Sequence, residues 1–113
     1  MRKPLDDAAL DAVFLAARTY NKFQDVPVTD ETIGRLYALL KWGPTAVNCQ
    51  SGRYVFVRSK EAKARLVPCL APGNVAKVEG APVTVIVAID PLFYEKLPTQ
   101  WTAYDAKAAY VAD

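Results

Sequence analysis

The chain has 113 residues, 52% of them apolar and 23% charged, which is typical of one globular domain. Its formal net charge is +2, and its basic residues stand beside acidic ones, so we expect no nucleic-acid partner. The longest apolar run covers residues 82–89, which is too short to cross a membrane, and residues 1–7 lack the apolar core of a signal peptide. We therefore expect no membrane partner and a cytoplasmic location.

The cysteine and histidine content limits the chemistry. The chain contains Cys49 and Cys69, no CxxC pair and no histidine, so neither a zinc site of the usual type nor a histidine-activated nucleophile is expected. We expect no metal ligands, and reduced thiols as in a cytoplasm. A thiol redox role for Cys49 is one alternative, and a buried, inert thiol is the simpler interpretation.

Two amphipathic helices are predicted in the first part of the chain. The first covers residues 6–18, because apolar side chains recur there at helical spacing. Those side chains are Leu10, Val13, Phe14 and Ala17. The second is capped by Thr29 and ends at Gly43 and Pro44. Its predicted buried stripe consists of Ile33, Leu36, Tyr37 and Leu40.

Two strands are predicted further along, at residues 53–59 and 81–90. The second is apolar without alternation, which indicates central strands covered on both faces. Ser59 is predicted to cap a helix that Pro68 ends or kinks. Residues 72–80 are predicted to form a turn followed by about one helical turn, residues 102–112 are helical in pattern, and residues 92–98 form a short helix or a loop. The order α-α-β-α-β-α predicts an α+β fold, but two strands make a poor sheet, so further strands should come from elsewhere or from a longer chain.

Three polar segments interrupt the apolar pattern at the ends of predicted elements. "ARTYNKF" offers the guanidinium of Arg18, the hydroxyl of Thr19 and the amide of Asn21, which suit a phosphate or a sugar. "KWGPTAVNCQ" leaves the second helix through a turn, and "PGNVAK" places Asn74 and Lys77 on one side of a helical turn. Each also has an ordinary explanation as a solvated charge, a turn residue or a helix cap.

Taken together, the order and spacing of "ARTYNKF", "KWGPTAVNCQ" and "APGNVAK" resemble the FMN-dependent nitroreductase family, over residues 14–98. The features match most closely a subgroup assigned to malonic semialdehyde reduction in pyrimidine breakdown. The resemblance implies an α+β fold with helices packed on a central mixed sheet. It also implies that residues 1–113 are a single domain, the amino-terminal portion of a longer family domain whose second half supplies more strands and flavin contacts.

The resemblance also implies roles for the first and third polar segments. Arg18, Thr19 and Asn21 match positions at the FMN phosphate and ribityl chain. Asn74 and Lys77 match a pair at the pyrimidine edge of the flavin ring. A cation there suits a flavin, because reduction places negative charge around that edge.

The loop after the second helix is expected to cover a flavin that is bound mainly by the other subunit of a homodimer. On this interpretation Gly43 and Pro44 turn the chain, and Thr45 and Ala46 are small because the ring lies against them. Asn48 then supplies an amide near the cofactor. The resemblance therefore implies contacts from Pro44, Thr45 and Asn48 to FMN.

The sequence departs from the family pattern at several positions. Ala17 stands where many members carry another arginine, and Asn21 stands where a basic residue is commoner. Ser51 and Gly52 replace a bulky pair, which indicates an open cavity near the flavin. Arg53 beside them is either a carboxylate anchor or a surface residue at the start of a strand.

The function implied by the resemblance is that of an NAD(P)H-dependent flavin oxidoreductase. Hydride would pass from NAD(P)H through flavin N5 to an acceptor in a ping-pong reaction, with no side chain acting as a nucleophile. The acceptor would be a small aldehyde such as malonic semialdehyde, a nitroaromatic compound or a quinone. The alternative is a non-catalytic binding or dimerisation module that lacks a complete flavin site.

Overall fold

The structure, a computed structural model, describes residues 3–111 and alternates helices with two strands. The α+β class is confirmed, and both strands lie where they were predicted, but two α-helices instead of one stand between the strands and two follow the second strand. In chain order they are α1 (Asp7–Leu10), α2 (Asp30–Leu40), β1 (Gly52–Val57), α3 (Lys60–Leu66), α4 (Val75–Gly80), β2 (Thr84–Ile89), α5 (Leu97–Gln100) and α6 (Ala106–Val111). Short helical segments of other types are η1 (Asp11–Leu15), η2 (Ala46–Asn48), η3 (Val67–Cys69), η4 (Pro72–Asn74) and η5 (Phe93–Lys96).

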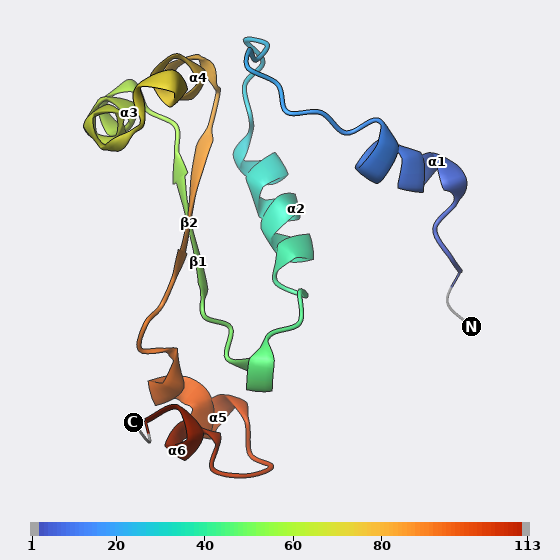
Figure 1. Ribbon diagram of the computed structural model, residues 1–113, viewed down its shortest axis with the longest axis vertical. Helices are drawn as coiled ribbons and strands as arrows, with labels where there is room; N and C mark the ends of the chain where they lie inside the picture. Colours follow the sequence, from blue (N-terminus) through green and yellow to red (C-terminus); the bar gives the residue numbers. More distant parts are fainter. Residues whose placement is uncertain (1–2, 112–113) are drawn as a thin grey trace.

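The sheet is an antiparallel pair of β1 and β2, running from Gly52 opposite Ile89 to Val57 opposite Thr84. The long connection between the strands is helical, so α3 and α4 lie at one end of the ribbon (Figure 1). The opposite end carries α5 and α6. Among residues 3–111 no parallel pairing occurs, so a mixed sheet would need strands that these residues do not supply.

Local signals in the sequence placed two helix starts correctly. The Thr29 hydroxyl accepts a hydrogen bond from the Thr32 backbone N–H at 3.2 Å, and the Ser59 hydroxyl accepts one from Ala62 at 3.1 Å. Such caps satisfy amides that have no partner within the helix. Pro68 also acts as predicted, because α3 stops at Leu66 and gives way to a tighter turn.

The first helix is shorter than predicted. Its α-helical part widens into the π-helical turn η1, which ends at Leu15 and not at Arg18. The Arg18 guanidinium folds back and donates from Nη1 to the carbonyl oxygens of Leu15 and Ala17, at 2.8 and 2.7 Å. Satisfying those terminal carbonyls from a side chain stabilises the early end of the helix.

The α2 helix lies beside the two-stranded ribbon (Figure 1). Side chains near both ends of the helix contact residues of β1 or next to it. Asp30 in its first turn forms an ion pair with Arg58, which directly follows β1. Near its end the Tyr37 ring meets the Tyr54 ring edge-on, with centroids 6.5 Å apart. These contacts bring the end of α2, and the loop that follows it, to the start of β1.

The main core is small and lies at the α5 and α6 end of the ribbon. Leu97 is fully buried, and Cys49 and Ala106 are buried beside it. The thiol of Cys49 is therefore buried, as the simpler interpretation predicted, whereas Cys69 is exposed. Because Cys49 directly follows η2, this core anchors the loop after α2.

Large apolar faces are uncovered, contrary to the predicted burial. Of the predicted α2 stripe only Ile33 is even half-buried, and Phe14 in η1 is 72% exposed. β2 is also exposed, with Val87 at 71%, so the prediction of strands covered on both faces is wrong for residues 3–111. No second layer from residues 3–111 packs on these faces, and the Cα radius of gyration is 18.5 Å. A compact chain of this length has about 13 Å.

Candidate functional site

The loop between α2 and β1 has the least ordinary backbone in the structure. Val47, Asn48 and Gln50 all have positive φ, at 44°, 54° and 45°. Left-handed backbone is uncommon outside glycine and asparagine, and for a β-branched residue such as Val47 it is a true outlier. Strained backbone of this kind clusters at functional sites, where the surrounding structure holds it in place.

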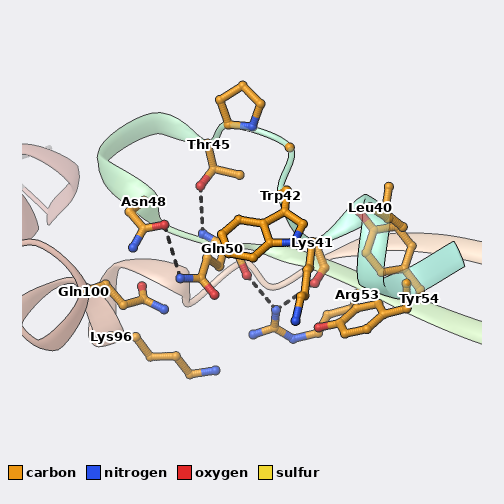
Figure 2. Close-up of a pocket in the computed structure, with 14 residues that line it drawn as sticks. Leu40, Lys41, Trp42, Thr45, Asn48, Gln50, Arg53, Tyr54, Lys96 and Gln100 are labelled. Atoms are coloured by element: carbon orange, nitrogen blue, oxygen red, sulfur yellow. Dashed lines mark hydrogen bonds between the residues drawn. The ribbon is translucent and has the colours of Figure 1, made fainter. Parts of the chain in front are cut away.

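Contacts on two sides hold this loop. On the inner side Val47 and Cys49 pack into the core. On the outer side the Thr45 hydroxyl accepts a hydrogen bond from the Gln50 backbone N–H, and the Asn48 side-chain oxygen accepts one from the Gln50 amide, both at 3.2 Å. Because Val47 and Cys49 point inward, Thr45 and Asn48 are left exposed at the surface of the loop (Figure 2).

The outer side of the loop forms one wall of a cavity of about 740 Å³. The end of α2, the start of β1 and the η5–α5 segment form the other walls. The cavity is lined by Tyr37, Leu40, Lys41, Trp42, Gly43, Pro44, Thr45, Asn48, Gln50, Gly52, Arg53, Tyr54, Lys96 and Gln100. All of its charged lining residues are basic (Figure 2).

Asp90, directly after β2, joins two of these basic residues. Its Oδ2 accepts from Arg53 Nη2 at 2.7 Å and from Lys96 Nζ at 3.2 Å, while Oδ1 accepts from the Leu92 backbone N–H at 3.0 Å. The Leu92 hydrogen bond first, and then Lys96 and Arg53, hold the pKa of Asp90 below its ordinary value. The stability that this ionised carboxylate contributes is therefore present above its ordinary pKa and is lost as the pH falls through the lowered one.

The structure brings together only one of the three predicted polar segments. Pro44, Thr45 and Asn48 all line the cavity. Asn74 and Lys77 lie in the η4–α4 region, at the opposite end of the ribbon (Figure 1). The Asn74 side chain makes no capping hydrogen bond although it stands at the start of α4, so its amide is available to a ligand.

The remaining predicted residues, Arg18, Thr19 and Asn21, are exposed in the segment between η1 and α2. None of these three residues lines the cavity, and neither does Asn74 or Lys77. The cavity therefore takes its lining from only one of the three predicted segments.

Sequence reasoning missed several cavity residues. Lys96 and Gln100 lie far along the chain from the loop and reach the cavity only because η5 and α5 pack beneath η2. No spacing pattern links them to residues 41–54. Lys41 and Trp42 belong to the motif "KWGPTAVNCQ", but no role was predicted for them. Their position at the end of a helix and next to a turn is a signal that could have identified them as binding residues.

The family model for the "Nitroreductase family" matches residues 15–112. The chain belongs to the nitroreductase family. The expectation drawn from the three motifs is thereby confirmed at the level of the family. The subgroup is a finer assignment that the family match does not reach.

Curated relatives of this nitroreductase chain are bacterial. A protein of Rhodopseudomonas palustris (strain TIE-1), provisionally named as an NADH dehydrogenase/NAD(P)H nitroreductase, is 53% identical over 98% of this chain and 57% of its own length. A protein of Burkholderia lata with the same provisional name is 50% identical over 96% of this chain and 56% of its own length. The chain thus spans somewhat more than half the length of these relatives.

A solved structure confirms the fold. The crystal structure of a provisionally named nitroreductase of Exiguobacterium sibiricum 255-15, in complex with FMN, superposes with a TM-score of 0.73. That match covers 87% of this chain and 45% of the other, at 24% sequence identity. Within residues 3–111 no helix is long and apolar enough to span a membrane, and no cluster of metal-ligating side chains occurs.

Proposed function

We propose that this chain is part of an FMN-dependent NAD(P)H oxidoreductase whose flavin site is completed by a second subunit. The observation that carries the proposal is the separation of the loop after α2 from the segment around Asn74 and Lys77. The strained loop displays Thr45 and Asn48 on a different surface from Asn74 and Lys77. A loop that covers a flavin held by the other subunit of a homodimer requires this arrangement.

The residues present fit a flavin. The Arg18 guanidinium has donors left after its two backbone contacts, so it can still bind a phosphate. The Asn74 amide is not used as a cap, and Lys77 follows it on the same helical turn. A cation at this place would stabilise negative charge at the pyrimidine edge. The relatives' names and the FMN complex of the structural neighbour support the same assignment.

When bound, FMN would supply the hydride chemistry, between NAD(P)H and an acceptor in a ping-pong sequence. The chain's own part is to bind and orient. Arg18, Thr19 and Asn21 hold the phosphate and ribityl chain. Pro44 and Thr45 belong to the loop that covers the flavin of the other subunit. No side chain serves as a nucleophile or a metal ligand. The acceptor is a small aldehyde such as malonic semialdehyde, a nitroaromatic compound or a quinone.

Lys77→Ala should weaken FMN binding about tenfold, because one charge-assisted contact to the ring is lost. The reduction potential of the bound flavin should also fall, since the anionic reduced form loses a compensating charge. Absorbance titration with FMN and spectroelectrochemistry measure these two effects. Lys60→Ala on exposed α3 is the matched control and should change neither.

An unchanged affinity and potential in Lys77→Ala would remove Lys77 from the flavin edge. A complete absence of FMN binding in the unmodified protein would contradict the proposal as a whole. That result would favour the alternative of a non-catalytic dimerisation module, which the exposed apolar faces would then serve.

A further inference from the structure

Gln50 joins the two polar residues that the loop after α2 displays. Its backbone N–H donates to the Thr45 hydroxyl, and its side-chain amide donates to Asn48 Oδ1. Its φ of 45° is left-handed, which is uncommon for a residue other than glycine and persists only where neighbouring contacts hold it. The placement of Thr45 and Asn48 therefore depends on what holds Gln50.

The Arg53 guanidinium holds Gln50 from the start of β1. Its Nη1 donates to the Gln50 carbonyl oxygen at 2.9 Å and to the Gly52 carbonyl oxygen at the same distance. A charged donor makes such a contact about twice as strong as a neutral one. Figure 2 shows the hydrogen bonds that run from the guanidinium to Gln50 and from Gln50 to the two displayed residues.

Asp90 fixes the same guanidinium from the other side. Its Oδ2 accepts from Arg53 Nη2 at 2.7 Å. Asp90 is itself held at the end of the ribbon, because its backbone N–H donates to the Ser51 carbonyl oxygen at 2.8 Å and its Oδ1 accepts from the Leu92 N–H. Arg53 thus connects a fixed point of the ribbon to the strained loop.

These contacts fit neither of the two interpretations of Arg53 that the sequence left open. A carboxylate anchor offers both terminal nitrogens of its guanidinium to the ligand, but both nitrogens of Arg53 already bind oxygens of the protein. A ligand bound in that way would have to displace Asp90. An idle surface residue, in turn, would not contact the carbonyl of a residue with strained backbone.

We propose that Arg53 is a positioning residue for the loop after α2. Fixed by Asp90, it holds the Gln50 carbonyl, and Gln50 in turn places Thr45 and Asn48. The consequence for the site rests on the proposed function: the loop meets the flavin of the other subunit in a preset conformation. A loop that is ordered in advance avoids the entropy cost of ordering on binding.

The first test is amide hydrogen exchange of the flavin-free 113-residue chain, followed residue by residue by NMR. Arg53→Met should speed exchange of the Gln50 backbone N–H about fivefold, because one charge-assisted hydrogen bond that holds the loop is lost. Asp90→Asn should also speed it, since the guanidinium loses its charged partner. Arg58→Met is the matched control, an arginine paired with Asp30 away from the loop, and should leave exchange at Gln50 unchanged.

The double variant Arg53→Met/Asp90→Asn separates positioning from a general loss of stability. If Asp90 acts on the loop through Arg53, the double variant should exchange at Gln50 no faster than Arg53→Met alone. Two independent losses of stability would multiply and would also speed exchange in α3. Arg53→Lys keeps the test decisive if Arg53→Met does not fold. A single ammonium cannot reproduce the two-sided fork, so exchange at Gln50 should be fast there too.

Titration with FMN and riboflavin tests the consequence for the site. Arg53→Met should weaken both flavins alike, about fivefold, because the loop covers the ring that the two share. The proposal would be overturned by unchanged exchange at Gln50 in both Arg53 variants, by an equal change in Arg58→Met, by multiplied effects in the double variant, or by unchanged affinity for both flavins. If the unmodified chain bound no FMN, the proposed function would fail, and exchange at Gln50 would still decide whether Arg53 positions the loop.

Discussion

Leu97→Ala is expected to lower the free energy of unfolding by about 2–5 kcal/mol, the largest stability effect of any single truncation within residues 3–111. Leu97 is the one large side chain that is fully buried within residues 3–111, and it packs beneath Cys49 and Ala106. Because so few other side chains share this core, little can move in to fill the space. Urea denaturation followed by circular dichroism measures the loss.

Leu39→Ala is the control for that variant. Leu39 is 76% exposed on α2, so the same change should cost less than about 0.5 kcal/mol. Equal losses of unfolding free energy in the two variants would mean that Leu97 is not the central residue of the core. The loop carrying Thr45 and Asn48 would then be held by something other than this cluster.

Arg18→Ala should weaken FMN binding by about 10- to 100-fold and riboflavin binding much less. The reason is that a guanidinium on a phosphate contributes about 1.5–3 kcal/mol, and riboflavin has no phosphate. Fluorescence titration of the two flavins against the same variant gives both affinities. The ratio of the two losses is informative, because a general loss of folding would weaken both flavins alike.

Arg35→Ala serves as the matched control, since Arg35 is another exposed arginine and lies on α2. It should leave both affinities unchanged. If riboflavin lost as much as FMN in Arg18→Ala, the side chain would be acting through its backbone contacts to Leu15 and Ala17, and the phosphate role would be withdrawn.

Features that depend on neighbouring residues were predictable from the sequence. Thr29 and Ser59 begin helices because their hydroxyls reach the amides three residues on, a relation that is visible in the chain itself. The turn at Gly43 and Pro44 and the two strands follow from equally local chemistry. The motif around Asn48 and the two other polar motifs identified the family, because their order and spacing along the chain are the signal.

Features that depend on distant packing were not predictable. Apolar periodicity indicated that Leu36 and Phe14 would be buried, but it could not show that no layer within residues 3–111 covers them. The π-helical end at Leu15 depends on where the Arg18 side chain folds. Lys96 and Gln100 meet the loop only through the packing of α5, so no spacing in the sequence revealed the basic cavity.

On the proposed function, residues 1–113 form a flavin site only together with a second chain. Sedimentation velocity with simultaneous detection of protein and flavin absorbance tests it directly. We expect flavin absorbance to travel with a species heavier than one 113-residue chain, because the loop after α2 and the segment around Asn74 and Lys77 lie at opposite ends of the ribbon. A monodisperse single chain that carries stoichiometric FMN would contradict it.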